Sequence, residues 1–322
     1  MPRQPRLDVP GLVHHVMARG IEGWDIFRDD ADREGFLKRL GDLANKPGGP
    51  RLYAWALLPS HCHLLLRPTE GFLSPFMRRL MTGHAVTYNL RHRRKGHLFQ
   101  NRYKSIVVEE ETYFLELVRY IHLNPVRAGI VKNVEELANY PYSGHSVIMG
   151  KREYSAQDVD TVLARFSERK KAALDGYIDF VAAGFNQGRR EELRGGGLIR
   201  SSGGMAKLLT RNPEEREPSD ERILGSGDFV ESVLWENDNY DNKCRASIED
   251  ILNEVAARLG ISREEILGAS HSRYVTSARR EFFLRAHKEA GATITMLGKL
   301  RGRSHVAVRM AIEQMKAKQD GR

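Results

Sequence analysis

The stretch LYAWALLPSHCHLLLRP, at residues 52–68, constrains the fold more than any other part of this chain. This apolar run predicts a β-strand with a bend at Pro59, because proline lacks the N–H that a strand ladder needs. Side chains alternate along a strand, so His61 and His63 lie on one face and Cys62 points the other way. Two imidazoles at this spacing can share one divalent cation. Paired histidines in strands also occur as surface or hydrogen-bonded residues, and the stretch alone leaves both interpretations open.

The composition favours a reduced, cytoplasmic protein with an anionic partner. The chain has 322 residues, enough for two or three domains, and a formal net charge of +9. A basic balance favours nucleic acid as the partner. The only cysteines, Cys62 and Cys244, make neither a disulfide framework nor a zinc finger. No apolar run reaches 18 residues and no signal peptide is recognisable, so we expect no membrane association.

The first 150 residues alternate between strand and helix patterns. Strands are predicted at 11–17, 52–68 and 105–108, and helices at 29–44, 74–94 and from 111 to the boundary before Pro125. This order predicts an α+β domain that ends near Gly150, with a sheet covered by helices on one face. His14 and His15 fall in the first strand, where we expect exposed or core-edge side chains with no role in a site.

A basic segment runs from Arg67 to Lys104 and contains a single acid, Glu70. Tyr88, Phe99 and Tyr103 interrupt it, and phosphate contacts combined with aromatic stacking are typical of single-stranded nucleic-acid sites. The alternative is an ordinary solvated face. The side chains that we expect to contact DNA here, together with one from the turn after the first strand, are Arg19, Arg78, Arg79, Arg91, Arg93, Arg94, Arg102, Tyr103 and Lys104.

The third predicted helix carries a polar stripe beside its apolar face. Tyr113, Glu116, Tyr120 and Asn124 follow one another at helical spacing. Pro125 biases Asn124 away from helical dihedrals, so the helix is expected to end there. Asn124 is then either the N-cap of the next turn or an oxygen ligand, and the two roles do not exclude each other.

The rest of the chain divides into three parts. Residues 151–187 read as a helical extension, and 188–243 lose periodicity, which predicts a linker or a segment that wraps the first domain. Residues 244–322 regain a helical pattern, with capping-box-like starts at Ser247 and Ser262. Two short helices joined at Arg301-Gly302-Arg303 resemble a helix-turn-helix, although a helical bundle that binds nothing is the alternative.

These parts suggest phosphodiester chemistry. Mg²⁺ or Mn²⁺ held by His61 and His63 could polarise a scissile phosphate. A tyrosine on the third helix could attack the phosphorus and conserve the bond energy in a covalent phosphotyrosine. Hard cations prefer oxygen donors, so a third ligand is wanted, and Asn124 is the candidate.

Four segments together resemble one enzyme family. PSHCHLLL resembles the HUH metal motif of single-tyrosine transposases, with Cys62 as an unusually small middle residue. RYIHLNPVRAGIV, GLVHHVMARG and FQNRYKS resemble the branch of REP-associated tyrosine transposases. The resemblance covers about residues 5–150. It implies a ferredoxin-like antiparallel sheet, with Tyr120 as the nucleophile and His61, His63 and Asn124 around the metal. Insertion-sequence relatives commonly have glutamine where Asn124 stands.

The C-terminal segment is separately similar to the DNA-binding domain of the replication initiator DnaA. SARR at residues 277–280 and GRSHVAVRMAI stand where that domain has its basic helix and its recognition signature. Only the histidine and the last valine of that signature remain, so a DnaA-like base specificity does not follow. The similarity implies an all-α helix-turn-helix domain that binds double-stranded DNA, with Arg279, Arg280, Arg303, Ser304 and His305 as contacts.

The leading hypothesis is a metal-dependent enzyme that nicks and rejoins single-stranded, hairpin-bearing DNA through a 5′-phosphotyrosine. A domesticated DNA-binding regulator without turnover is the alternative, and a metal-dependent hydrolase that uses activated water is a third reading. The resemblance leaves open whether the protein acts as a monomer or a homodimer.

Overall fold

The computed structural model describes residues 6–9, 11–69, 73–188, 190, 193, 219–243, 247–270, 272–290, 292, 294–302 and 305–320. The chain divides into two compact units, Met1–Trp235 and Glu236–Arg322. The first unit is a mixed α+β structure around a sheet, and the second is helical. None of the helices in the described ranges is long and apolar enough to cross a membrane.

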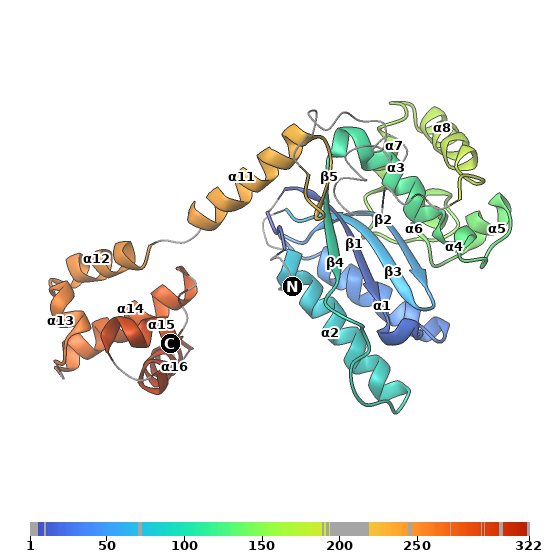
Figure 1. The fold of residues 1–322 in the computed structure, drawn as a ribbon. Helices are drawn as coiled ribbons and strands as arrows, with labels where there is room; N and C mark the ends of the chain where they lie inside the picture. Colours follow the sequence, from blue (N-terminus) through green and yellow to red (C-terminus); the bar gives the residue numbers. More distant parts are fainter. Residues whose placement is uncertain are drawn as a thin grey trace. The chain divides into compact units, whose positions relative to one another are not determined.

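The sheet of the first unit has the strand order β2-β3-β1-β4-β5 (Figure 1). Its strands are β1 (Val13–Arg19), β2 (Arg51–Leu58), β3 (His61–Arg67), β4 (Lys104–Val108) and β5 (Ile223–Leu224). The first four pair antiparallel to their neighbours, and β5 pairs parallel to β4. The central strand β1 therefore lies between the strand that carries the paired histidines and the strand that follows the basic segment.

The stretch at 52–68 forms a hairpin, so the prediction of one bent strand is wrong. The chain reverses at Pro59 and Ser60, and β2 pairs with β3. Proline supplies no ladder donor, and the two turn carbonyls are used elsewhere. The Pro59 carbonyl accepts hydrogen bonds from the N–H groups of Ile26 and Phe27, at 2.8 and 3.0 Å, and the Ser60 carbonyl accepts one from Gly20 at 2.8 Å. These bonds fix the turn against the segment after β1.

Helices cover both faces of the sheet, which corrects the prediction of helices on one face (Figure 1). On one face, α1 (Asp30–Ala44) and α2 (Leu73–Arg91) pack over Trp55, Leu57 and Leu64. On the other, α3 (Glu110–His122) packs over Tyr53 and Ala54. Every residue of β2 after Arg51 is buried, and a strand buried on both sides needs cover on both faces.

Short helices extend the layer around α3. They are α4 (Asn124–Arg127), α5 (Val134–Asn139), α6 (Gly144–Ile148), α7 (Val159–Leu163) and α8 (Lys170–Ala183). Val162 of α7 and Tyr177 of α8 lie in the same core cluster as Leu117 of α3. The segment predicted as a helical extension therefore shares the core of the first unit.

Part of the predicted linker is ordered. Within it, β5 is followed by α11 (Gly227–Lys243), which runs across the boundary between the two units. Ile223, Val230 and Val233 are buried together with Val107 of β4. This half of the segment closes the open edge of the sheet beside β4, as the alternative of a wrapping segment predicts. Residues 194–218 lie outside the described part of the chain.

The second unit contains α12 (Ile248–Leu259), α13 (Arg263–Leu267), α14 (Arg273–Lys288), α15 (Ile294–Arg301) and α16 (His305–Asp320). The predicted caps are present: Ser247 accepts from Asp250 N–H, and Ser262 forms a complete capping box with Glu265. Gly302, between α15 and α16, has a φ of +65°, which glycine adopts without strain. The helix-turn-helix assignment of these two helices remains a prediction.

Candidate active site

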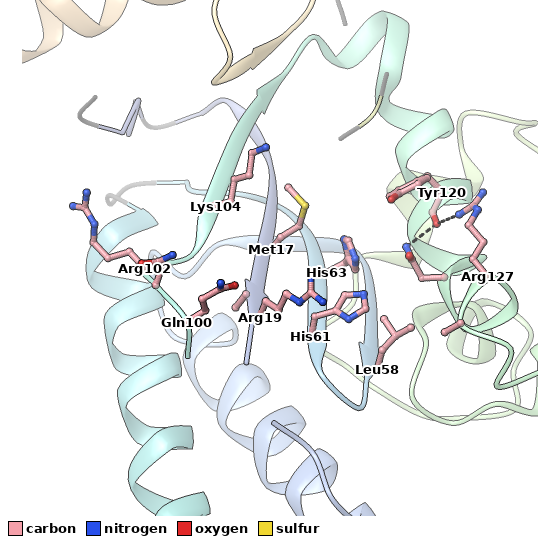
Figure 2. Close-up of a pocket in the computed structure, with 14 residues that line it drawn as sticks. Met17, Arg19, Leu58, His61, His63, Gln100, Arg102, Lys104, Tyr120 and Arg127 are labelled. Carbon is pink, nitrogen blue, oxygen red and sulfur yellow. Dashed lines mark hydrogen bonds between the residues drawn. The ribbon is translucent and has the colours of Figure 1, made fainter. Parts of the chain in front are cut away.

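A cavity of about 540 Å³ opens between the sheet and the end of α3 (Figure 2). It collects residues from four parts of the first unit that are far apart in sequence. β1, the β2–β3 hairpin, the segment that leads into β4, and the α3–α4 junction each contribute side chains. The lining residues include Met17, Arg19, Leu58, His61, His63, Gln100, Asn101, Arg102, Lys104, Tyr120, Asn124 and Arg127.

The two histidines of β3 line this cavity from the same face of the strand. The ring centroids of His61 and His63 are 5.2 Å apart. Cys62 lies on the opposite face, 2% exposed, within the core under α1 and α2. Burial raises the pKa of its thiol to about 12. The prediction that Cys62 points into the core, away from the histidines, is confirmed.

His15 is part of the same cluster, and the prediction of an exposed or core-edge side chain is wrong. It is 1% exposed, and its Nε2 lies 2.9 Å from Nδ1 of His63. The register explains the contact: Met17 pairs with His63 across β1 and β3, and His15 shares the face of Met17 two residues earlier. The identity of the strand next to β3 is the signal that was missing from the sequence.

His14, on the other face of β1, is buried at 0% exposure and takes no part in the cavity. Its Nδ1 lies 3.0 Å from Oγ of Ser105 on the neighbouring strand β4. Burial lowers the pKa of His14 to about 4. His14 is a fully buried core histidine, deeper than the exposed or core-edge position that was predicted.

Tyr120 reaches the cavity from α3 and meets two of the histidines. Its ring centroid lies 6.0 Å from those of both His15 and His63, in edge arrangements. Tyr120 is 3% exposed, so its position is fixed by packing. In Figure 2, Tyr120 and Arg127 lie on one side of the two histidines, and Arg102 lies on the other.

Arg127 contacts both the ring and the carbonyl of Tyr120, and the sequence did not suggest these contacts. The guanidinium carbon lies 4.7 Å from the Tyr120 ring centroid, within cation–π range. Nη1 donates to the Tyr120 carbonyl at 2.7 Å, and Nε donates to the Gly188 carbonyl, also at 2.7 Å. Arg127 therefore joins α3 to the chain after α8.

Asn124 closes the end of α3. Its Nδ2 donates to the carbonyl of Tyr120 at 2.9 Å, so this carbonyl at the helix end accepts from both Asn124 and Arg127. The N-cap of α4 is Leu123, so the interpretation of Asn124 as an N-cap is wrong. With the amide nitrogen turned to the helix, the amide oxygen is the ligand atom that Asn124 can offer to a cation in the cavity.

The residues fit a divalent cation. His61 and His63 are oriented through Nδ1, by Ser60 Oγ at 3.2 Å and by His15, so a cation would be bound through Nε2 of each ring. Asn124 adds an oxygen donor from the same cavity. Imidazole suits transition metals, and an amide oxygen suits Mg²⁺ and Mn²⁺, so this mixed set fits Mn²⁺ at least as well as Mg²⁺.

A second cluster of side chains that could bind a metal ion is paired with an arginine. Among the described residues, Asp29, Asp32 and His92 have ligand atoms within 4.8 Å of one another. Arg91 forms ion pairs with both carboxylates, and it helps to lower the pKa of Asp29 to about 2. We interpret the cluster as an ion-pair network. The prediction of Arg91 as a DNA contact stays a prediction, with its donors engaged by Asp29 and Asp32.

The other basic residues of the first unit differ in position. Arg19, Arg102 and Lys104 are exposed and line the cavity. Arg78, Arg79 and Arg93 are also exposed but lie outside it, and Arg94 packs against Trp24 at 5.2 Å.

Tyr103 is 8% exposed, with Arg6 over its ring at 3.9 Å. Base stacking needs an open ring face, so the prediction of Tyr103 as a stacking residue is corrected.

The predicted DNA contacts of the second unit differ in their exposure to solvent, and some lie outside the described residues. Arg279 is 4% exposed and donates to four backbone carbonyls, so the prediction that it contacts DNA is wrong. Arg280 is half-buried and stays a candidate. Arg303 and Ser304 lie outside the described residues, and the structure describes His305 only as the first residue of α16.

Comparison with known proteins gives a distant match to a solved structure. No family model matches the sequence, and no curated protein is similar to it. Among solved structures, the chain is similar to a REP-associated tyrosine transposase bound to a REP hairpin. The match has 18% sequence identity and a TM-score of 0.37, and it covers 49% of this chain and 98% of the other. Function is therefore inferred from the residues of the cavity.

Proposed function

We propose that the first unit nicks and rejoins single-stranded DNA through a covalent bond to Tyr120. The observation that carries this proposal is the cavity itself. The tyrosine of the third helix, the paired histidines and Asn124 line one space, although β3 and α3 are more than 40 residues apart in sequence. Arg19, Arg102 and Lys104 on the same walls fit a phosphodiester substrate.

The order of elements also supports the proposal. β1, α1, β2, β3, α2 and β4 follow one another as in a β-α-β-β-α-β unit, which is the ferredoxin-like arrangement that the motif resemblance implies. The first four strands are antiparallel in the order β2-β3-β1-β4, and β5 adds a parallel edge strand. In this arrangement the central strands β1 and β3 present His15 and His63 to α3.

The reaction is a transfer of one phosphodiester bond. The Tyr120 oxygen forms a bond to phosphorus, the bond from phosphorus to the 3′ oxygen breaks, and the released strand ends in a 3′-hydroxyl. A cation bound by His61, His63 and Asn124 would neutralise charge that develops on the phosphate. Arg127 and the Asn124 amide hold Tyr120 in place, since both bind its carbonyl. Attack by a 3′-hydroxyl on the phosphotyrosine reverses the step and rejoins the strand without ATP.

The test uses a 3′-labelled single-stranded oligonucleotide from the flanks of the gene, with Mn²⁺ or Mg²⁺. The label should move with the protein on a denaturing gel, because the tyrosine keeps the 5′ phosphate of the downstream fragment. Tyr120→Phe should abolish this adduct and retain DNA binding. Tyr113→Phe is the matched control, because Tyr113 lies on the same helix and does not line the cavity.

Two other outcomes would replace the proposal. Cleavage without any adduct, unaffected by Tyr120→Phe, would indicate a hydrolase that uses activated water. Binding without cleavage under every metal condition would indicate a regulator without turnover.

For the second unit we propose that α14, α15 and α16 bind double-stranded DNA, with Arg280 of α14 among the contacts. The proposal rests on the predicted helix-turn-helix, and Arg280 keeps part of its surface exposed. Loss of duplex binding in Arg280→Ala, with an unchanged melting temperature, would support it.

A further inference from the structure

A second cavity, of about 800 Å³, runs along α2 beside the candidate active site. We call it the α2 groove. Its floor is largely apolar: Met77, Met81 and Ala85 come from α2, and Leu98 and Phe99 come from the segment before β4. Val86, on the same helix, is 55% exposed, so the groove presents apolar surface to the solvent.

The rim of the α2 groove is cationic. Arg6, Arg78 and Arg102 line it, and its described lining residues include no aspartate or glutamate. An apolar floor beside a rim whose charged residues are all basic complements a ligand with both apolar faces and negative charges. Single-stranded DNA has this character, because its unstacked bases expose their faces while each phosphate carries one charge.

The groove adjoins the candidate active site. Gln100, Asn101 and Arg102 line both cavities, so a chain bound at the histidines can continue into the groove without leaving the protein surface. Arg102 points away from Tyr120 and toward α2 in Figure 2. From Arg78 to Asn89 the helix side of the groove is about 16 Å long, at 1.5 Å per residue, which is room for a few nucleotides.

We propose that the α2 groove binds nucleotides of the cleaved strand that flank the scissile phosphate. Their bases lie against Met81, Val86 and Phe99, and their phosphates contact Arg78 and Arg102. The inference rests on the proposed function and adds that the substrate is recognised as unpaired bases on one side of the cleavage point. A duplex does not fit, because its bases are stacked inside.

The helix offers matched controls for two groove residues. Arg78 and its neighbour Arg79 are both exposed, but only Arg78 lines the groove. Val86 lines the groove, whereas Leu90 is 76% exposed one turn later and does not. Each pair has the same helix and similar chemistry, and differs in position relative to the groove.

The experiment measures the affinity of the full chain for a labelled single-stranded oligonucleotide by fluorescence anisotropy, in the Tyr120→Phe background so that no adduct forms. Val86→Glu and Arg78→Glu should weaken binding at least fivefold, the size of one lost stacking contact. Leu90→Glu should change it less than twofold, and Arg79→Glu should weaken it less than Arg78→Glu does, because Arg79 lies outside the groove. Equal losses in both members of each pair would overturn the proposal, because they would reflect net charge alone.

Abasic substitutions then locate the nucleotides. Replacing a base that occupies the groove should weaken DNA binding by the protein that retains Val86. The same replacement should weaken binding by Val86→Glu little further, since both changes remove the same contact. If no position shows this coupling, the proposal is wrong. It is also wrong if Val86→Glu alters the oligomeric mass by light scattering and leaves DNA affinity intact, because the groove would then be an interface between copies of this chain.

A negative result for the α2 groove can be distinguished from a negative result for the proposed nicking activity. An oligonucleotide cut back to the nucleotides around the scissile phosphate should still form the Tyr120 adduct in Val86→Glu, at the rate of the unmodified protein. Adduct formation without any groove effect rejects the groove and retains the nicking activity.

Discussion

The Nε2 atom of His15 lies 2.9 Å from Nδ1 of His63, with the two rings stacked at 5.2 Å and both buried. This contact orients the His63 ring, so that a metal would be bound through the nitrogen on the other side. Partners of this kind fix the tautomer of a metal-binding histidine and commonly affect affinity 10- to 100-fold.

His15→Phe should therefore weaken Mn²⁺ binding by about 10- to 100-fold, because it keeps a ring and loses the nitrogen. Mn²⁺ affinity is measured directly, by electron paramagnetic resonance of the unbound ion, so the readout does not depend on catalysis. His14→Phe is the control, since His14 is buried in the same strand on the opposite face. Wild-type Mn²⁺ affinity in His15→Phe would show that the contact does not serve the metal.

Arg127 should matter for the position of Tyr120. Arg127→Met removes the cation–π contact and two hydrogen bonds to carbonyls. We expect the rate of adduct formation to fall by about 10- to 100-fold, as small displacements of a reacting group do, with little change in DNA affinity. The rate is read from the gel assay in single turnover.

The control for Arg127 is Arg165, whose guanidinium lies 5.4 Å from the ring of Phe114, also on α3. Arg165→Met removes a comparable contact at a distance from the cavity and should leave the rate within twofold. Equal slowing by both variants would mean that general loosening of α3 accounts for the effect.

Local features of the site could be predicted from the sequence. The alternation of side chains along a strand places His61 and His63 together and Cys62 in the core, and the structure has this arrangement. Helix caps are equally local, and the capping box at Ser262 was predictable from four consecutive residues. Such features depend only on neighbours in the chain.

Features that depend on tertiary contacts could not be predicted. Periodicity marks His15 as a strand residue but does not say that β1 pairs with β3, and this pairing decides its role. The contacts of the basic residues also depend on the tertiary structure. Arg91 and Arg279 resemble DNA contacts by charge alone, yet folding places carboxylates around the first and carbonyls around the second. Sequence charge does not distinguish a cation that faces solvent from one that completes the core.

Buried histidines should make the first unit sensitive to acid. Burial lowers the pKa of His14 and of His145 to about 4, from 6.5. Between these values the unfolded chain binds more protons than the folded one, so the free energy of unfolding falls as the pH falls. Each histidine contributes a slope of about 1.4 kcal/mol per pH unit in this window and none above pH 7.

Urea denaturation between pH 7.5 and 4.5 measures this slope. His145→Phe should reduce it by about one proton, because a phenylalanine does not titrate. Its loss of the contact to Tyr177, at 2.6 Å, lowers stability at every pH and so changes the intercept without changing the slope. A slope equal to that of the unmodified protein would show that His145 is not the titrating group.

Arg279 should be required for the stability of the second unit. Its guanidinium donates to the carbonyls of Glu265, Ile266, Gly268 and Ser270, at 2.6 to 3.1 Å. Arg279→Met removes these donors from one buried and three part-buried bonds, and a buried acceptor left without a donor costs about 1–3 kcal/mol. We expect a loss on the order of 3 kcal/mol, read as a lower melting temperature of the second unit in calorimetry of the full chain.

Arg280→Met provides the comparison, because Arg280 is half-buried on the same helix and a change there should stay within about 0.5 kcal/mol. The pair also separates stability from DNA binding. If duplex affinity falls in Arg280→Met at an unchanged melting temperature, Arg280 contacts DNA. If duplex affinity falls only in Arg279→Met, and its melting temperature is lower, the loss of affinity follows from unfolding. An unchanged melting temperature in Arg279→Met would contradict the role of its four hydrogen bonds in the core.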